Sequence, residues 1–125
     1  MIDIKLEEPE VATGGFLSAR VRWSSDKERQ PRRIVIVAEW ETGGAGDRVR
    51  GVGRSKQFVP PANRHGGELR VRLLIPHEGP VSFEGQAVSI AWKLWVRIDQ
   101  WGVDEVSHAE FRVHARRRSP CHPEA

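Results

Sequence analysis

The chain is poor in the residues and runs that define several protein classes. Among its 125 residues there is one cysteine, Cys121, and no tyrosine. A single cysteine cannot form a disulfide within the chain, so a reducing, cytoplasmic setting is the expectation. No run of about 18 apolar residues occurs, which argues against a membrane-spanning helix. The first ten residues lack an apolar core, so no secretory signal is expected there.

The motifs of common enzymes and cofactor-binding proteins are also missing. There is no zinc-binding cysteine pattern and no Gly-x-Ser-x-Gly elbow. The glycines of 43–46 precede no Lys-Ser or Lys-Thr pair, so they indicate a turn rather than a phosphate-binding loop. We therefore predict no catalytic residue, no metal site and no cofactor. The remaining enzyme alternative is a metal-dependent activity at His108 and Glu110, which alternate on one strand face about 6.6 Å apart.

What the chain has throughout is alternation of apolar and polar residues, the pattern of half-buried strands. Residues 34–40 differ, because they are apolar on both faces and so predict a central strand covered on both sides. Gly51 and Gly53 predict a β-bulge in the segment that follows. The expected strands cover residues 2–6, 17–23, 34–40, 48–59, 69–75, 88–98 and 109–113.

Seven or eight strands without a helix predict an all-β fold of two antiparallel sheets, since each sheet must bury its apolar face. A closed barrel is the structural alternative. We expect one domain over residues 1–115 and a disordered basic tail over 116–125. Trp23, Trp40 and Trp92 fall on inward faces and are expected in the core.

Residues 69–98 contain a moderately specific motif. A strand ends at Pro76, a short loop runs from Pro80 through Ser82 and Phe83 to Gly85, and a long strand containing Trp92 follows. This stretch resembles the corresponding segment of arrestin domains. Two weaker similarities to arrestin-like proteins lie upstream, in Thr13-Gly14-Gly15 and in VIVAEWETGGAGD of residues 35–47.

The resemblance implies an immunoglobulin-like β-sandwich of the arrestin type. Arrestins, the arrestin-like retromer subunit and bacterial sporulation-control proteins carry two such sandwiches, whereas this chain has room for one. The residues of the motif also make physical sense as a structural corner. Pro76 and Pro80 cannot donate to a sheet and direct the chain out of it, Gly85 tolerates a corner conformation, and Phe83, which follows Ser82, is expected to plug the open end of the sandwich.

Trp95 is the main candidate for an interface residue. It shares a strand face with Lys93 and Arg97, opposite Trp92. An aromatic side chain on a polar face is either covered by a neighbouring element or offered to a partner, and both readings stay open here. Trp101, in a predicted turn, is a second candidate.

These observations predict a non-catalytic protein-interaction or scaffold module that binds through strand edges or an exposed sheet face. The expected partner is another protein or a second copy of the chain. The alternative is a nucleic-acid or anionic-ligand binder, consistent with a formal net charge of +3. It requires that neighbouring strands place one basic outer face beside Trp95, built from Arg20, Arg22, Arg70, Arg72, Lys93 and Arg97.

Overall fold

The computed structural model describes residues 1–25, 30–44, 49–62, 64–84 and 88–116. Within these ranges every regular element is a strand. The nine strands are β1 (Ile2–Leu6), β2 (Glu10–Ala12), β3 (Phe16–Ser24), β4 (Pro31–Gly44), β5 (Arg50–Phe58), β6 (Gly66–Leu74), β7 (Phe83–Glu84), β8 (Val88–Gln100) and β9 (Glu105–His114).

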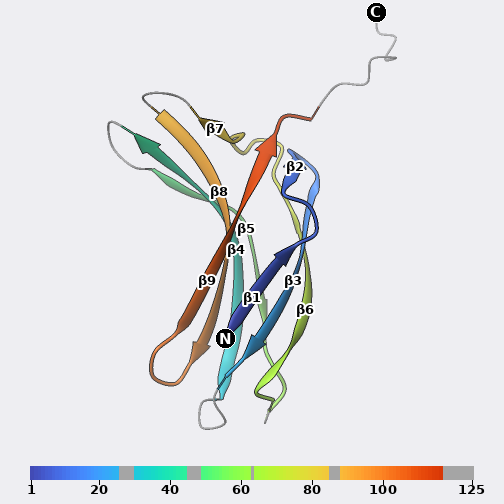
Figure 1. Ribbon diagram of the computed structural model, residues 1–125, viewed down its shortest axis with the longest axis vertical. Helices are drawn as coiled ribbons and strands as arrows, with labels where there is room; N and C mark the ends of the chain where they lie inside the picture. Colours follow the sequence, from blue (N-terminus) through green and yellow to red (C-terminus); the bar gives the residue numbers. More distant parts are fainter. Residues whose placement is uncertain (26–29, 45–48, 63, 85–87, 117–125) are drawn as a thin grey trace, which may run out of the picture.

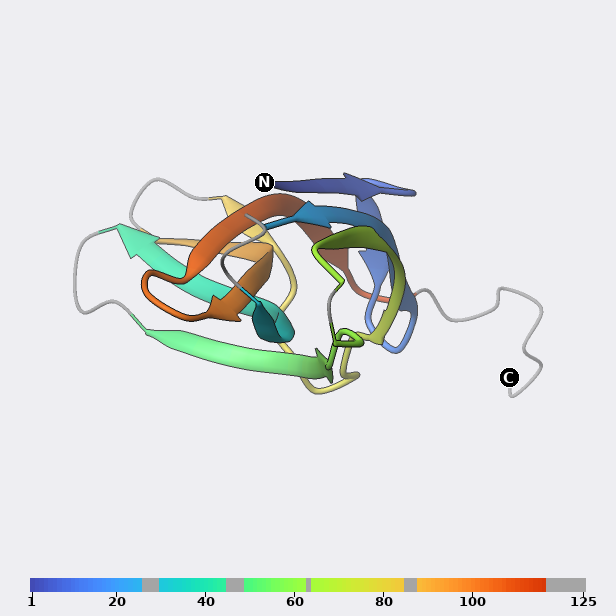
Figure 2. The same ribbon diagram turned by 90° about the horizontal axis from the view of Figure 1, so that it is seen from below.

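The strands form two sheets that pack face to face (Figures 1 and 2). The smaller sheet has the order β1-β3-β6, and the larger has the order β2-β9-β8-β4-β5, with β7 beside β8. In Figure 2, β1 and β5 lie on opposite sides of the molecule. The predicted all-β, two-sheet sandwich is confirmed, and the described strands do not close into a barrel.

Two short strands were not expected from the sequence. β2 has three residues and β7 has two, which is too short to show alternation. β2 pairs in parallel with β9, so the sheets are antiparallel except for this one pair. Both short strands lie at the end of the sandwich opposite the β8–β9 turn (Figure 1).

The strand bounds and the bulge follow the sequence closely. β4 begins at Pro31 rather than at Ile34, because proline is tolerated as the first residue of a strand. The predicted bulge is confirmed: Ala38 lies opposite Arg54 and the next residue of β4 lies opposite Val52, so Gly53 is the extra residue. A side chain at Gly53 would meet the Trp92 ring at 2.8 Å, which explains why glycine is needed there.

Trp92 is the centre of the core. Its side chain is fully buried, and its ring lies 5.7 Å from that of Phe111. The indole Nε1 donates a 2.8 Å hydrogen bond to the carbonyl oxygen of Pro80, so the one polar atom of this ring is satisfied. Trp23 is also buried and Trp40 is partly buried against the core, as predicted.

The segment between β6 and β8 is fastened to β9. The Ser82 amide donates to the Val113 carbonyl oxygen at 2.7 Å, and the Val113 amide donates to Ser82 Oγ at 2.8 Å. Phe83, expected to plug the end of the sandwich, is instead 54% exposed, because β7 pairs with β8 at Ile90 and leaves Phe83 lining a surface pocket rather than the core. Gly85 lies outside the described residues.

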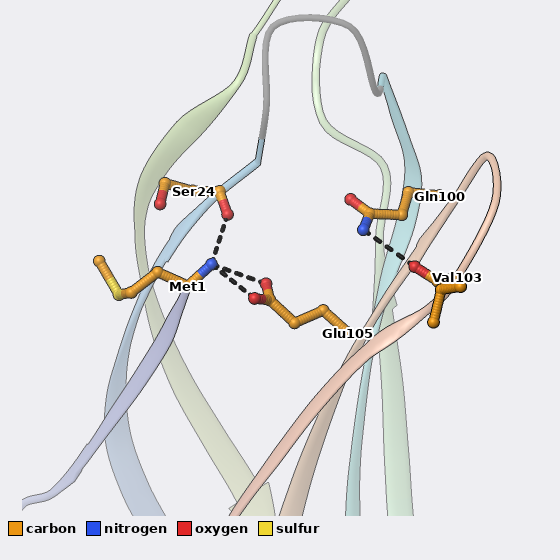
Figure 3. Close-up of polar contacts among 5 residues, drawn as sticks. All are labelled: Met1, Ser24, Gln100, Val103 and Glu105. Atoms are coloured by element: carbon orange, nitrogen blue, oxygen red, sulfur yellow. Dashed lines mark hydrogen bonds and ion pairs between the residues drawn. The ribbon is translucent and has the colours of Figure 1, made fainter.

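The two sheets are also joined at the end where the chain starts (Figure 3). The Met1 amino group donates to both Glu105 carboxylate oxygens at 2.7 Å and to the Ser24 carbonyl oxygen at 2.8 Å. This contact connects β1 of the smaller sheet to the start of β9 in the larger one. In the β8–β9 turn nearby, Gln100 Nε2 donates to the Val103 carbonyl oxygen at 3.0 Å.

At the other end, the Arg116 amide donates to Thr13 Oγ1 at 3.2 Å. Residues 117–125 lie outside the described residues, so the division into a domain over 1–115 and a tail over 116–125 stays a prediction.

Candidate protein-interaction surface

The outer face of the larger sheet carries Trp95 at its centre. In the strand register, Val37 of β4 and His108 of β9 lie directly opposite Trp95 on its two sides. The next row places Val35 and Val106 on either side of Arg97. Directly opposed residues of a sheet point to the same face, so valines from β4 and β9 surround the tryptophan.

These side chains line a shallow hollow of about 270 Å³. Trp95 is half-buried, its ring lies 4.6 Å from the His108 ring, and Lys93 Nζ lies 5.9 Å from the Trp95 ring centroid. Val106 is 51% exposed. No second layer of described strands covers this face, so Trp95 is shielded only by its neighbours in the same sheet. The hollow is lined by Val35, Val37, Glu39, Arg50, Trp95, Arg97 and Val106.

This arrangement corrects one prediction. The apolar residues on both faces of β4 indicated a strand covered on both sides. Ile34, Ile36 and Ala38 are buried in the core, but Val35 and Val37 on the opposite face are only half-buried. The apolar outer positions of β4 therefore form part of an exposed sheet face rather than a face covered by a second layer.

The charges around the hollow are balanced. Opposed pairs on this face neutralise one another, and Glu39 lies directly opposite Lys93. Such a rim of mixed charge around an apolar centre is the usual anatomy of a protein-protein interface. The ion pairs are Arg33–Asp99 at 2.9 Å, Arg50–Glu41 at 3.1 Å, Arg50–Glu39 at 3.8 Å and Arg97–Asp104 at 4.0 Å.

The structure does not bring the predicted basic face together. Arg70 and Arg72 lie on β6 of the smaller sheet, whereas Lys93 and Arg97 lie on β8 of the larger sheet. The outer faces of the two sheets point away from each other. Trp95 therefore lies on the face opposite to Arg70 and Arg72, and the arrangement required by the nucleic-acid alternative is not formed.

Trp101 occupies a third location. It lies in the β8–β9 turn, where its side chain is 73% exposed and the Arg32 guanidinium lies 5.3 Å from its ring. The candidate interface residues thus divide among the larger sheet, the smaller sheet and this turn.

The histidines of β9 show no arrangement that would hold a metal. His108 packs against Trp95, and His114 Nδ1 lies 3.8 Å from a carboxylate oxygen of Glu10. Within the described residues there is no group of three or more His, Cys, Asp or Glu side chains suited to a metal ion. The same part of the chain contains no helix long and apolar enough to cross a membrane.

One pocket was not expected from the sequence. β9 stops pairing with β8 at Phe111, and β7 takes its place beside the end of β8. Between β7 and β9 lies a pocket of about 420 Å³ above Trp92 and Phe111, and Glu84 and Arg112 are among its lining residues. No pattern within one strand could reveal it, because it results from the divergence of two strands.

This chain is similar to a known protein in its structure, whereas comparisons of its sequence find no match. No family model and no curated protein matches this sequence. The crystal structure of Spo0M, a sporulation control protein from Bacillus subtilis, superimposes with a TM-score of 0.70 and 16% sequence identity. The match covers 92% of this chain and 49% of that one, so this chain spans about half the length of the protein it resembles. The chain therefore has the arrestin-like β-sandwich fold that its sequence predicted.

Proposed function

We propose that this chain is a non-catalytic protein-interaction module that binds another protein, or a second copy of itself, through the outer face of the larger sheet. The observation that carries the proposal is the hollow around Trp95, which has valines at its centre and balanced charges at its rim. Tryptophan and arginine are the residues most enriched at energetic centres of interfaces, and Trp95 and Arg97 lie side by side here.

The arrestin-like fold supports the same function. A sandwich of this kind presents sheet faces and strand edges, which other proteins can bind. The module is expected to act in the cytoplasm.

The test uses a photo-crosslinking amino acid at Val106, the exposed residue that borders Trp95, in the otherwise unchanged chain. The same amino acid at Val103, which is 73% exposed in the turn, is the position control. We expect crosslinks from Val106 to one protein, or to a second copy of the chain, and few from Val103. Light scattering after size exclusion separates these two outcomes.

Trp95→Ala should abolish the crosslinks, whereas Trp101→Ala, which removes another exposed indole, should leave them unchanged. A partner captured equally by the Trp95→Ala variant would overturn the proposal. So would a strictly monomeric chain that yields no crosslinked partner from position 106.

A further inference from the structure

The outer face of the smaller sheet carries an unusual row of charges. Lys5 of β1 lies opposite Arg20 of β3, and Arg20 lies opposite Arg70 of β6. Adjacent strands are about 4.8 Å apart, so three cations follow one another across about 10 Å of sheet. Like charges directly opposite one another destabilise a sheet, so this row, here called the cationic row, is not explained by folding.

In the neighbouring row of the same sheet, charges of opposite sign alternate, as is usual in sheets. There Arg22 lies between Asp3 and Glu68, so a cation has an acid on each side. The contrast between two adjacent rows of one sheet shows that this face is not uniformly mixed. Positive charge is concentrated at one row and at Arg72, which follows on β6.

The cations of this row have few partners within the described residues. Arg20 reaches Glu68 only at 3.9 Å, and Lys5 and Arg70 are exposed with no ion pair or side-chain hydrogen bond. The Arg72 guanidinium lies 3.9 Å from the centre of the exposed Phe16 ring. At the outer edge of β6, Lys56 Nζ donates to the Arg72 carbonyl oxygen at 2.8 Å, which adds another cation beside the row.

The chemistry of these residues favours discrete carboxylates as the ligand. Arginine presents a planar fork that binds a carboxylate through two hydrogen bonds, which a lysine cannot do. Arg70 and Arg72 are two residues apart on one strand, so they repeat at about 6.8 Å, as alternate side chains of an extended peptide do. Among the described residues, the aromatic ring beside them is that of Phe16, and the Arg72 guanidinium already occupies one of its faces, which disfavours the stacking of nucleobases there.

We propose that Arg70 and Arg72, with Arg20 and Lys5 of the cationic row beside them, bind an extended acidic segment of a partner protein that carries carboxylates at alternate positions. The site lies on the smaller sheet, opposite the Trp95 face, so it is independent of the function proposed above and either can fail alone.

The experiment measures binding of two fluorescent peptides to the full chain at low ionic strength. One peptide alternates glutamate and serine, and the other has the same composition with its glutamates in one block. We expect saturable binding of the alternating peptide, weaker binding of the block peptide, and loss of both as salt is raised.

The double variant Arg20→Gln and Arg70→Gln should weaken binding by about tenfold, the loss expected for two exposed charge pairs. The matched control, Arg32→Gln with Arg112→Gln, removes the same net charge from the larger sheet at two exposed positions and should leave binding within about twofold, since neither position lies on the smaller sheet. Circular dichroism establishes that the wild type and both double variants are folded.

Three results would overturn the proposal. The first is no saturable binding of the alternating peptide at low salt. The second is equally weakened peptide binding in both double variants, which would show that binding depends on net charge and not on the position of the arginines. The third is tighter binding of duplex DNA or of phosphatidylserine vesicles with the same dependence on Arg20 and Arg70, which would assign the row to a different class of partner.

Discussion

At the scale of single residues, glycines mark the places where the backbone or a neighbour leaves no room for a side chain. Gly14 has a φ of 77°, and a side chain there would fall within the His77 ring. Its amide donates to the Ile75 carbonyl oxygen at 2.7 Å, so this turn holds the start of β3 against the end of β6. Both the positive φ and the contact argue for glycine.

Gly14→Ala should therefore lower the free energy of unfolding by about 1–3 kcal/mol, because the new methyl group strains the backbone and displaces His77. Urea denaturation followed by tryptophan fluorescence measures this. Gly79→Ala is the matched control, since a methyl group there would make an ordinary contact of 3.4 Å with Trp92. Equal stability of the two variants would show that the Gly14 turn adapts without cost.

At the scale of strands and their connections, Ser82 links the corner to β9. Ser82→Ala removes the acceptor of the Val113 amide and leaves that partly buried donor unsatisfied. We expect a loss of about 1–3 kcal/mol in unfolding free energy, together with faster proteolysis between β6 and β8. Ser55→Ala, on the exposed strand β5, is the control and should change stability little. Unchanged proteolysis in the Ser82 variant would contradict this role of the hydroxyl.

Strand pairing also predicts one substitution that should raise the stability of the fold rather than lower it. Arg70→Gln removes a cation from the row in which it faces Arg20, so the variant should be as stable as the wild type or more stable by about 0.2–1 kcal/mol at low salt. Arg33→Gln removes a cation that is paired with Asp99 at 2.9 Å and should be slightly destabilising. Thermal unfolding at two salt concentrations checks both, and the difference should shrink at high salt. A destabilised Arg70 variant would mean that this arginine supports the fold.

At the scale of the whole molecule, the two proposed surfaces lie on opposite faces of the sandwich (Figure 2). Sites that share no partners and lie far apart behave additively. Trp95→Ala should therefore leave binding of the alternating acidic peptide within about twofold of the wild type, and Arg20→Gln with Arg70→Gln should leave crosslinking from position 106 intact. Loss of both activities in either variant would show that the surfaces are coupled or that the variant is misfolded.

The location of the longer strands and the orientation of their side chains could be read from the residues alone, whereas the short strands β2 and β7 could not. Alternation placed Trp92 inward and Trp95 outward, and Gly51 and Gly53 together predicted the bulge that the structure places at Gly53. The exposure of Phe83 could not be predicted, because it depends on the pairing of β7 with β8, which no pattern within one strand specifies. The face of the sheet to which a side chain points is set by its own strand. Whether that side chain is buried depends on residues distant in the chain.

The amino-acid order by itself determined that this protein is a β-sandwich, because successive side chains of an extended backbone point to opposite sides and the apolar ones must meet. It also determined which side chains lie on the outer faces. Only the tertiary structure decided which outer faces are shared: β6 pairs with β3 and β8 with β4, so Arg70 joins Arg20 and Lys5 while Trp95 joins Val37. The physical reason is that strand partners are selected by long-range packing of whole sheets, which the pattern within one strand does not specify.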